Sequence, residues 1–199
     1  MSQIKERPIL FSAPMVRAIL EGRKTVTRRA VKFPFIDRAV GCELSGNEIG
    51  PDEIRNNCPY GVPGQRLWVR ETWARVGNDD PGYLTFGATY PSCLPPELEN
   101  IPPASQIRWK PSIHMFRRDS RILLEITDVR VERLQDITYE QAAAEGVHRG
   151  PLREWCASDE GGACHKYPVP AFRDLWQSVG GNWDANPWVW VVEFKRVTP

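Results

Sequence analysis

The sequence lacks any hydrophobic run that approaches the roughly 20 apolar residues a helix needs to span a membrane. Its N-terminal segment, residues 1–8, is charged and lacks the apolar core of a signal peptide. Internal repeats and low-complexity tracts are also missing. We therefore expect a cytoplasmic globular protein without a membrane partner.

The chain has no excess of charge of either sign. It carries 26 lysine and arginine residues against 25 aspartate and glutamate residues, a formal net charge of +1. A nucleic-acid-binding surface must therefore be a local patch, because the molecule has no general basic field. A length of 199 residues, of which 41% are hydrophobic, fits one domain over residues 1–199 with insertions.

Cysteine is scarce and irregularly spaced. An odd number of widely spread cysteines favours reduced thiols over a disulfide framework: Cys42, Cys58, Cys93, Cys156 and Cys164. His148 and His165 add zinc-ligand types near the last two, but no Cys-x-x-Cys pair is present and adjacent Cys164 and His165 are unusually spaced for zinc. We therefore expect no metal or cofactor, and interpret residues 147–167 as a polar loop with free thiols that can cover a pocket.

The segments that are present are mostly of β type, joined by long connections rich in proline. Strands are expected at 8–11, 66–73, 83–90, 121–134 and 188–196. Within the fourth segment the apolar residues change parity after Ile126, so a bend or bulge is expected near Thr127 and Asp128.

Helix signals flank these strands. A helix capped by Ser12 is expected to end at Gly22, a second to open at a capping box beginning at Thr138 and end at Gly146, and a third to span 170–179. Residues 33–64 are rich in glycine, proline and asparagine and are expected to have little regular structure. The pattern predicts an α+β fold: one small mixed β-barrel flanked by short helices, with insertions near 33–60, 77–107 and 147–167.

The segment 19–29 carries the most specific chemistry. Gly22 is placed to end a helix, and the β-branched run 25–27 then favours a strand. At such a junction Lys24 and Thr27 can point into one pocket. A hydroxyl beside an amine is a workable nucleophile and base, provided that the amine is neutral.

The spacing of Gly22, Lys24 and Arg29, Gly-x-Lys-x-x-x-x-Arg, resembles the signature of the ASCH family, whose domains are similar to the PUA RNA-binding barrel. Segments 63–71 and 186–194 resemble larger ASCH proteins of phages and prophages. The resemblance covers most of residues 5–75, 105–147 and 168–197. Most members carry glutamate at the position of Thr27, whereas a subgroup with threonine includes small bacterial N4-acetylcytidine amidohydrolases.

The resemblance implies a catalytic group of Lys24, Thr27 and Glu145, which lies in the short helix after the long strand. In that reading Thr27 is the nucleophile, Lys24 its base or an oxyanion partner, and Glu145 the group that protonates the departing amine. Alternatively, Glu145 activates a water molecule and Thr27 only positions the acyl group. The implied substrate is an N4-acylated cytosine nucleoside.

A basic and aromatic set provides candidates for substrate binding: Arg28, Arg29, Trp109, His114 and Arg117. Glu71, which follows a Pro-Gly turn, is a further candidate for the pocket wall. Aromatic rings stack on bases and arginines bind phosphates, so the same set also fits a non-enzymatic binder of RNA or single-stranded nucleic acid. A ribonuclease is a third reading suggested by the family. The sequence shows no carboxylate cluster for a two-metal mechanism to support it.

Overall fold

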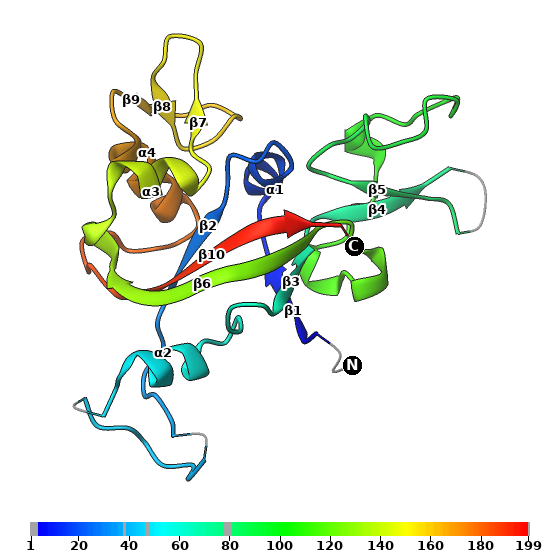
Figure 1. Ribbon diagram of the computed structural model, residues 1–199. Coiled ribbons are helices and arrows are strands. Elements are labelled where there is room, and N and C mark those ends of the chain that lie inside the picture. The colour runs from blue at the N-terminus through cyan, green and yellow to red at the C-terminus, as the bar shows by residue number, and fades with distance from the viewer. Residues whose placement is uncertain (1–3, 38, 47, 78–80, 199) are drawn as a thin grey trace.

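The computed structural model describes residues 4–198 apart from 38, 47 and 78–80. Its centre is a five-stranded mixed sheet in the order β1-β3-β6-β10-β2 (Figure 1). The strands span β1 Glu6–Leu10, β2 Val26–Ala30, β3 Arg66–Arg70, β6 Leu123–Arg133 and β10 Trp188–Val197. β1 and β3 run parallel, and the other neighbours are antiparallel.

The long β6–β10 pair confirms the expected bulge. Glu193 of β10 faces Asp128 and the next residue, Phe194, faces Ile126, so Thr127 has no partner across the ladder. The extra residue reverses the side-chain parity of β6. Both Ile126 and Val129 consequently lie in the same buried core.

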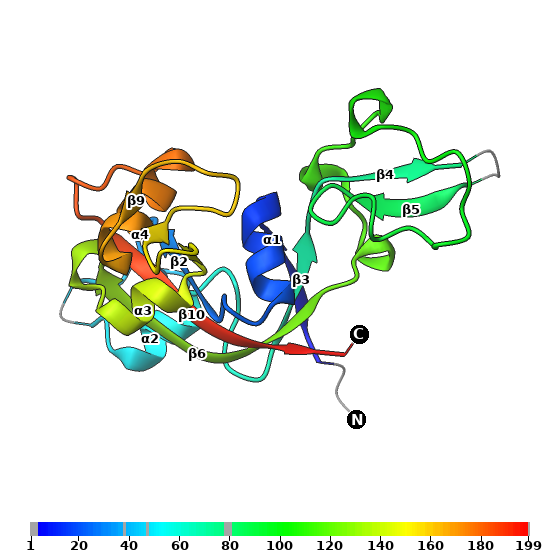
Figure 2. The same ribbon diagram turned by 90° about the horizontal axis from the view of Figure 1, so that it is seen from above.

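The α+β class is confirmed, but the hydrogen bonds of the described strands close no sheet into a barrel. β1 and β2 remain the two edges of the main sheet. α1 (Ala13–Leu20) connects these edges and lies between them (Figure 2). Its Val16 and Ile19 are buried in the sheet core, so the helix fills the gap that strand pairing would otherwise close.

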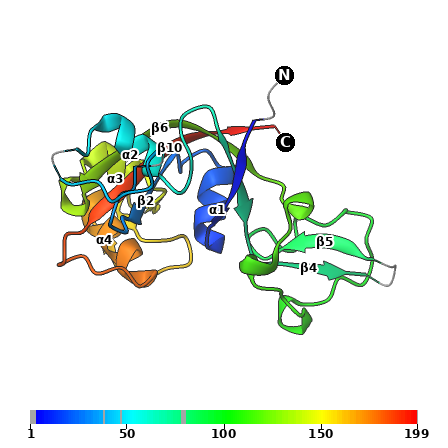
Figure 3. The same cartoon turned by 90° about the horizontal axis from the view of Figure 1, so that it is seen from below.

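The helix termini follow local chemistry. Ser12 is the N-cap residue of α1, and Gly22 just beyond its end has a φ of +76°. α3 (Tyr139–Ala144) has the complete capping box between Thr138 and Gln141, and α4 spans Pro168–Ser178. A helix also forms within 33–64, where little regular structure was expected: α2 (Pro51–Asn57) lies against β6 (Figure 3). Proline at its start and two acidic residues in its first turn favour it.

A separate lobe follows the main sheet. The strand expected over 66–73 ends at Arg70, and β4 (Trp73–Val76) then pairs with β5 (Tyr83–Phe86) away from the main sheet (Figure 2). Three 3-10 helices complete the lobe: η1 (Ala104–Gln106), η2 (Ser112–His114) and η3 (Arg117–Asp119). The lobe has its own small core around Trp73. Residues 78–80 of the expected insertion 77–107 lie outside the described residues.

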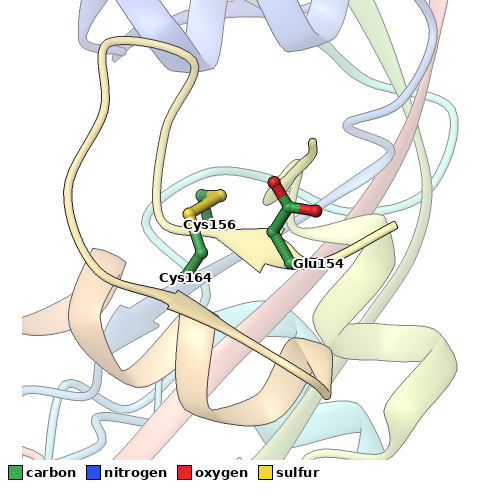
Figure 4. A group of neighbouring side chains, drawn as sticks. All are labelled: Glu154, Cys156 and Cys164. Atoms are coloured by element: carbon green, nitrogen blue, oxygen red, sulfur yellow. A yellow bond between two sulfur atoms is a disulfide. The ribbon is translucent and has the colours of Figure 1, made fainter. Parts of the chain in front are cut away.

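The segment 147–167 corrects the expectation of free thiols. It forms a small three-stranded sheet of β7 (His148–Arg149), β8 (Trp155–Cys156) and β9 (Cys164–His165). Cys156 and Cys164 face each other across β8 and β9, and a disulfide joins them (Figure 4). An odd cysteine count does not reveal which two cysteines the strand register brings together.

Candidate functional site

A cavity of about 220 Å³ lies between β2 and α4. Its polar wall comes from Thr27, Arg28 and Arg29 of β2 and from Glu145 at the end of α3. Its apolar wall comes mainly from α4. Of the sequence-predicted catalytic residues, Thr27 and Glu145 line this cavity, and Lys24 lies directly behind Glu145.

Lys24 is buried and makes three hydrogen bonds. Its Nζ donates to the carbonyl oxygen of Val26 at 2.8 Å, and to both the carbonyl and the Oε2 of Glu145 at 2.7 Å. Burial lowers the pKa of Lys24 from its ordinary value of 10.5, and the Glu145 carboxylate opposes that shift. Three acceptors account for all three protons of an ammonium group, so Lys24 is a cation in the resting site.

Glu145 is held by two cations. Its Oε2 accepts from Lys24, and its Oε1 lies 3.2 Å from Nη1 of Arg28. All three side chains are nearly inaccessible, with exposed fractions of 0%, 4% and 0%. The result is a buried row in which one carboxylate lies between a lysine and an arginine, held in a fixed orientation at the cavity wall.

Gly146 allows the end of α3 to pack closely against Lys24. Its φ of +91° is a conformation that favours glycine. A Cβ at this position would lie 2.9 Å from the Cβ of Lys24 and 3.0 Å from the Cβ of Ala18. The chain therefore turns after α3 at a point where only a hydrogen fits against Lys24.

Arg28, predicted as a substrate contact, has a structural role as well. Its Nη2 donates to Gln141 at 2.9 Å and lies 3.2 Å from Glu132. The same Gln141 oxygen accepts the backbone N–H of Thr138 in the capping box. Arg28 therefore joins β2, β6 and the first turn of α3, and fixes the helix that carries Glu145.

Thr27 faces the cavity, and its hydroxyl makes no hydrogen bond to any residue in the described part of the chain. The expected Lys24–Thr27 pair is not formed, because the donors of Lys24 go to Val26 and Glu145. Arg29 also lines the cavity, donating from Nη2 to the carbonyl of Leu10 at 2.7 Å. The hydroxyl of Thr27 is thus available to a ligand.

The remaining predicted substrate contacts do not line this cavity. Glu71 is buried in a two-point ion pair with Arg121, both contacts 2.9 Å long. Arg117 pairs with Glu6. Trp109 and His114 belong to the β4–β5 lobe, where Trp109 packs edge-on against Tyr90 and His114 lines a second cavity of about 310 Å³. Trp109 and His114 are suitable residue types for binding a base, but they lie on another lobe and do not contact a ligand in the first cavity.

Sequence patterns did not identify the apolar wall as part of the site. Phe172, Leu175 and Trp176 lie on the buried face of α4, and they also line the cavity. Trp176 has a buried Nε1 with no hydrogen-bond partner among the described residues. Gly181 packs against its indole ring, where a side chain would collide. In the sequence, the Gly180-Gly181 pair after α4 is the feature that could have indicated this close approach to Trp176.

The Cys/His segment does not form a thiolate metal site. Glu154, Cys156 and Cys164 place their candidate ligand atoms within 4.8 Å of one another (Figure 4). The disulfide occupies both sulfur atoms, and a disulfide sulfur is not the thiolate that zinc binds. His165, one of the two predicted histidine candidates, is hydrogen-bonded to Asp174 at 2.7 Å.

No family model, curated protein or solved structure matches this chain. Among the described residues, no helix is both long enough and apolar enough to cross a membrane. The chemistry of the Thr27–Glu145 cavity is therefore the basis for assigning a function.

Proposed function

We propose that this protein is an amidohydrolase that removes the acyl group from N4-acylated cytosine nucleosides, with an ASCH-like, PUA-related fold and a cytoplasmic location. One observation carries the proposal. The Glu145 carboxylate is fixed at the wall of a small cavity, beside the free hydroxyl of Thr27, by two buried cations.

The geometry favours Glu145 over Lys24 as the proton-transfer group. Lys24 donates all three of its protons to fixed acceptors and has no lone pair to offer. Glu145 borders the cavity as a carboxylate, which can accept a proton. Lys24 and Arg28 are then positioning residues that hold this carboxylate in place.

In the proposed reaction, Glu145 takes a proton from a water molecule whose oxygen attacks the acyl carbon. The carbonyl oxygen becomes an oxyanion, and in this proposal the Thr27 hydroxyl and the guanidinium of Arg29 stabilise it, since both residues line the cavity. Glu145 then delivers the proton to the exocyclic nitrogen as the carbon–nitrogen bond breaks. The products are the cytosine nucleoside and a carboxylic acid.

The size and lining of the cavity support a small planar ligand. A volume of about 220 Å³ lies below the roughly 300–1,000 Å³ typical of sites for drug-sized molecules. Phe172 and Trp176 provide aromatic surface on one side, opposite the polar strand. A pyrimidine base fits that combination, because it has an apolar face and a polar edge.

The test follows the absorbance change when N4-acetylcytidine is converted to cytidine. Glu145→Gln should lose at least about 100-fold in kcat/KM, since it removes the proton acceptor. Glu140→Gln is the matched control, because Glu140 is an exposed glutamate on the same helix. Equal activity of the two variants, or no conversion by the wild type at high enzyme concentration, would reject the proposal.

A second candidate, binding of RNA or single-stranded nucleic acid without chemistry, is favoured by the β4–β5 lobe. Phe116 is 59% exposed beside the second cavity, and the guanidinium of Arg118 lies 5.2 Å from its ring centre. An exposed ring with a neighbouring cation is typical of base stacking. This function requires salt-dependent oligonucleotide binding that Phe116→Ala weakens and Glu145→Gln leaves intact.

A further inference from the structure

The wall of the cavity that β2 provides is the free edge of a sheet. β2 is the last strand of the main sheet and pairs only with β10 among the described strands. Residues Thr27 to Ala30 of this strand border the cavity. An unpaired edge presents a row of main-chain donors and acceptors, which a ligand can use as a partner strand would.

The hydrogen bonds at the two ends of β2 show which main-chain groups face outward. Val31 donates to the carbonyl of Trp188, and Phe194 donates to the carbonyl of Thr25, both at 2.9 Å. The direction of main-chain groups alternates along a strand, so the odd-numbered residues face β10. The N–H and C=O groups of Val26, Arg28 and Ala30 therefore point to the free edge.

One contact already shows this edge accepting a partner. Nζ of Lys24 binds the outward carbonyl of Val26 at 2.8 Å. Further along, the main-chain groups of Arg28 and Ala30 make no hydrogen bond to other residues in the described part of the chain. The carbonyl of Arg28 and the N–H of Ala30 are thus an adjacent acceptor and donor without a protein partner, at the wall of the cavity.

We propose that this edge reads the base: the carbonyl of Arg28 accepts from the exocyclic N4–H of cytosine, and the N–H of Ala30 donates to ring nitrogen N3. A carbonyl and the N–H two residues later lie side by side on a strand edge. The N3=C4–N4–H edge of cytosine offers the complementary acceptor and donor. The proposal rests on the proposed function for the identity of the ligand.

The direction of the strand agrees with the chemistry. Glu145 lies toward the Val26 end of the edge, because Nζ of Lys24 binds both the carbonyl of Val26 at 2.8 Å and Oε2 of Glu145 at 2.7 Å. Arg28 is nearer to that end of the strand than Ala30. Reading N4 at Arg28 and N3 at Ala30 therefore places the nitrogen that carries the acyl group at the Glu145 end. The opposite orientation would point N4 away from the only carboxylate that borders the cavity among the described residues.

The same edge explains selectivity against uracil. Uracil presents a carbonyl oxygen where cytosine has N4–H, and an N–H where cytosine has the N3 lone pair. Placed in the same way, it sets acceptor against acceptor at Arg28 and donor against donor at Ala30. We expect cytidine to bind about 10-fold or more tightly than uridine, because the mismatched main-chain groups stay desolvated and unpaired.

A cycle of one main-chain change and one ligand change tests the reading. Ala30→Pro removes the N–H donor, and 3-deazacytidine replaces N3 by C–H. The wild type should bind cytidine roughly 5- to 100-fold more tightly than 3-deazacytidine by calorimetry. Ala30→Pro should bind both equally weakly, whereas Ala30→Val, which keeps the N–H, should retain the preference for cytidine.

Proline is suited to this position, because the N–H of Ala30 points away from β10 and Arg29 before it is already extended. The wild-type comparison of the two nucleosides needs no variant at all. A wild type that binds neither, or binds both equally, overturns the edge proposal, as does Ala30→Pro with an undiminished preference. Hydrolysis of N4-acetylcytidine is measured separately. The two proposals can therefore fail independently: the enzyme can hydrolyse its substrate without base recognition by the β2 edge, or the edge can recognise cytosine without hydrolysis.

Discussion

Replacing Glu145 by glutamine should destabilise the fold as well as abolish turnover. The carboxylate is 4% exposed and lies between Lys24 and Arg28, whose side chains are fully inaccessible. Removing the charge takes away the carboxylate that Lys24 binds and leaves Arg28 with Glu132 as its remaining acidic partner among the described residues. Breaking a buried ion pair by removing one partner costs about 3–5 kcal/mol.

That loss is large against the roughly 5–15 kcal/mol that stabilises a typical domain. Arg28 keeps Glu132 and Gln141 as partners, which places the expected loss at the lower end of the range, at about 3 kcal/mol. Urea unfolding followed by tryptophan fluorescence measures it, with the eight tryptophans as probes. Glu140→Gln on the exposed face of α3 should change the free energy of unfolding by less than about 0.5 kcal/mol.

A compensated variant separates charge from packing. Lys24→Met with Glu145→Leu removes both members of one pair and fills the space with apolar side chains, so it should recover much of the loss. If Glu145→Gln unfolds within about 0.5 kcal/mol of Glu140→Gln, the carboxylate is solvated, and the account of Glu145 as a buried, cation-held base is refuted.

Three further changes test other parts of the structure. Burial lowers the pKa of Lys24 in the folded protein, so below pH 10.5 the unfolded chain binds more protons than the folded one. The free energy of unfolding, measured relative to Lys24→Met, should therefore rise as the pH increases toward 10.5, and a difference that does not change with pH contradicts the lowered pKa. Gly146→Ala should lower the free energy of unfolding in urea by at least about 1–2 kcal/mol. The loss should exceed that of Gly22→Ala, because Gly22 has a similar φ but no atom within 4 Å of an added Cβ; equal losses would argue against the close approach of Gly146 to Lys24. Replacing Cys156 and Cys164 by serine should lower the free energy of unfolding by about 2.5 kcal/mol from loop-closure entropy alone, and an unchanged urea midpoint with and without reductant would show that the bond does not form in solution.

Features set by neighbouring residues could be predicted from the sequence. The capping box at Thr138, the glycine beyond α1 and the parity change at Thr127 were predicted and are present. Each depends on backbone preferences or side-chain parity within a few residues, which the sequence states directly. The grouping of Lys24 with Glu145 came from the family resemblance, since residues 121 positions apart leave no local signal.

Tertiary structure decided the remaining features. The order of strands makes β2 an edge and opens its main chain to the cavity, although its sequence of Val26 to Ala30 would suit an interior strand equally well. The register of β8 and β9 pairs two cysteines that counting had assigned to free thiols. The strand expected over 66–73 ends at Arg70, and Trp109 and His114 lie on the separate lobe that begins after it. In each case the outcome depends on which segments, distant in the chain, bury their apolar surfaces together, and that choice is made only when the whole chain packs.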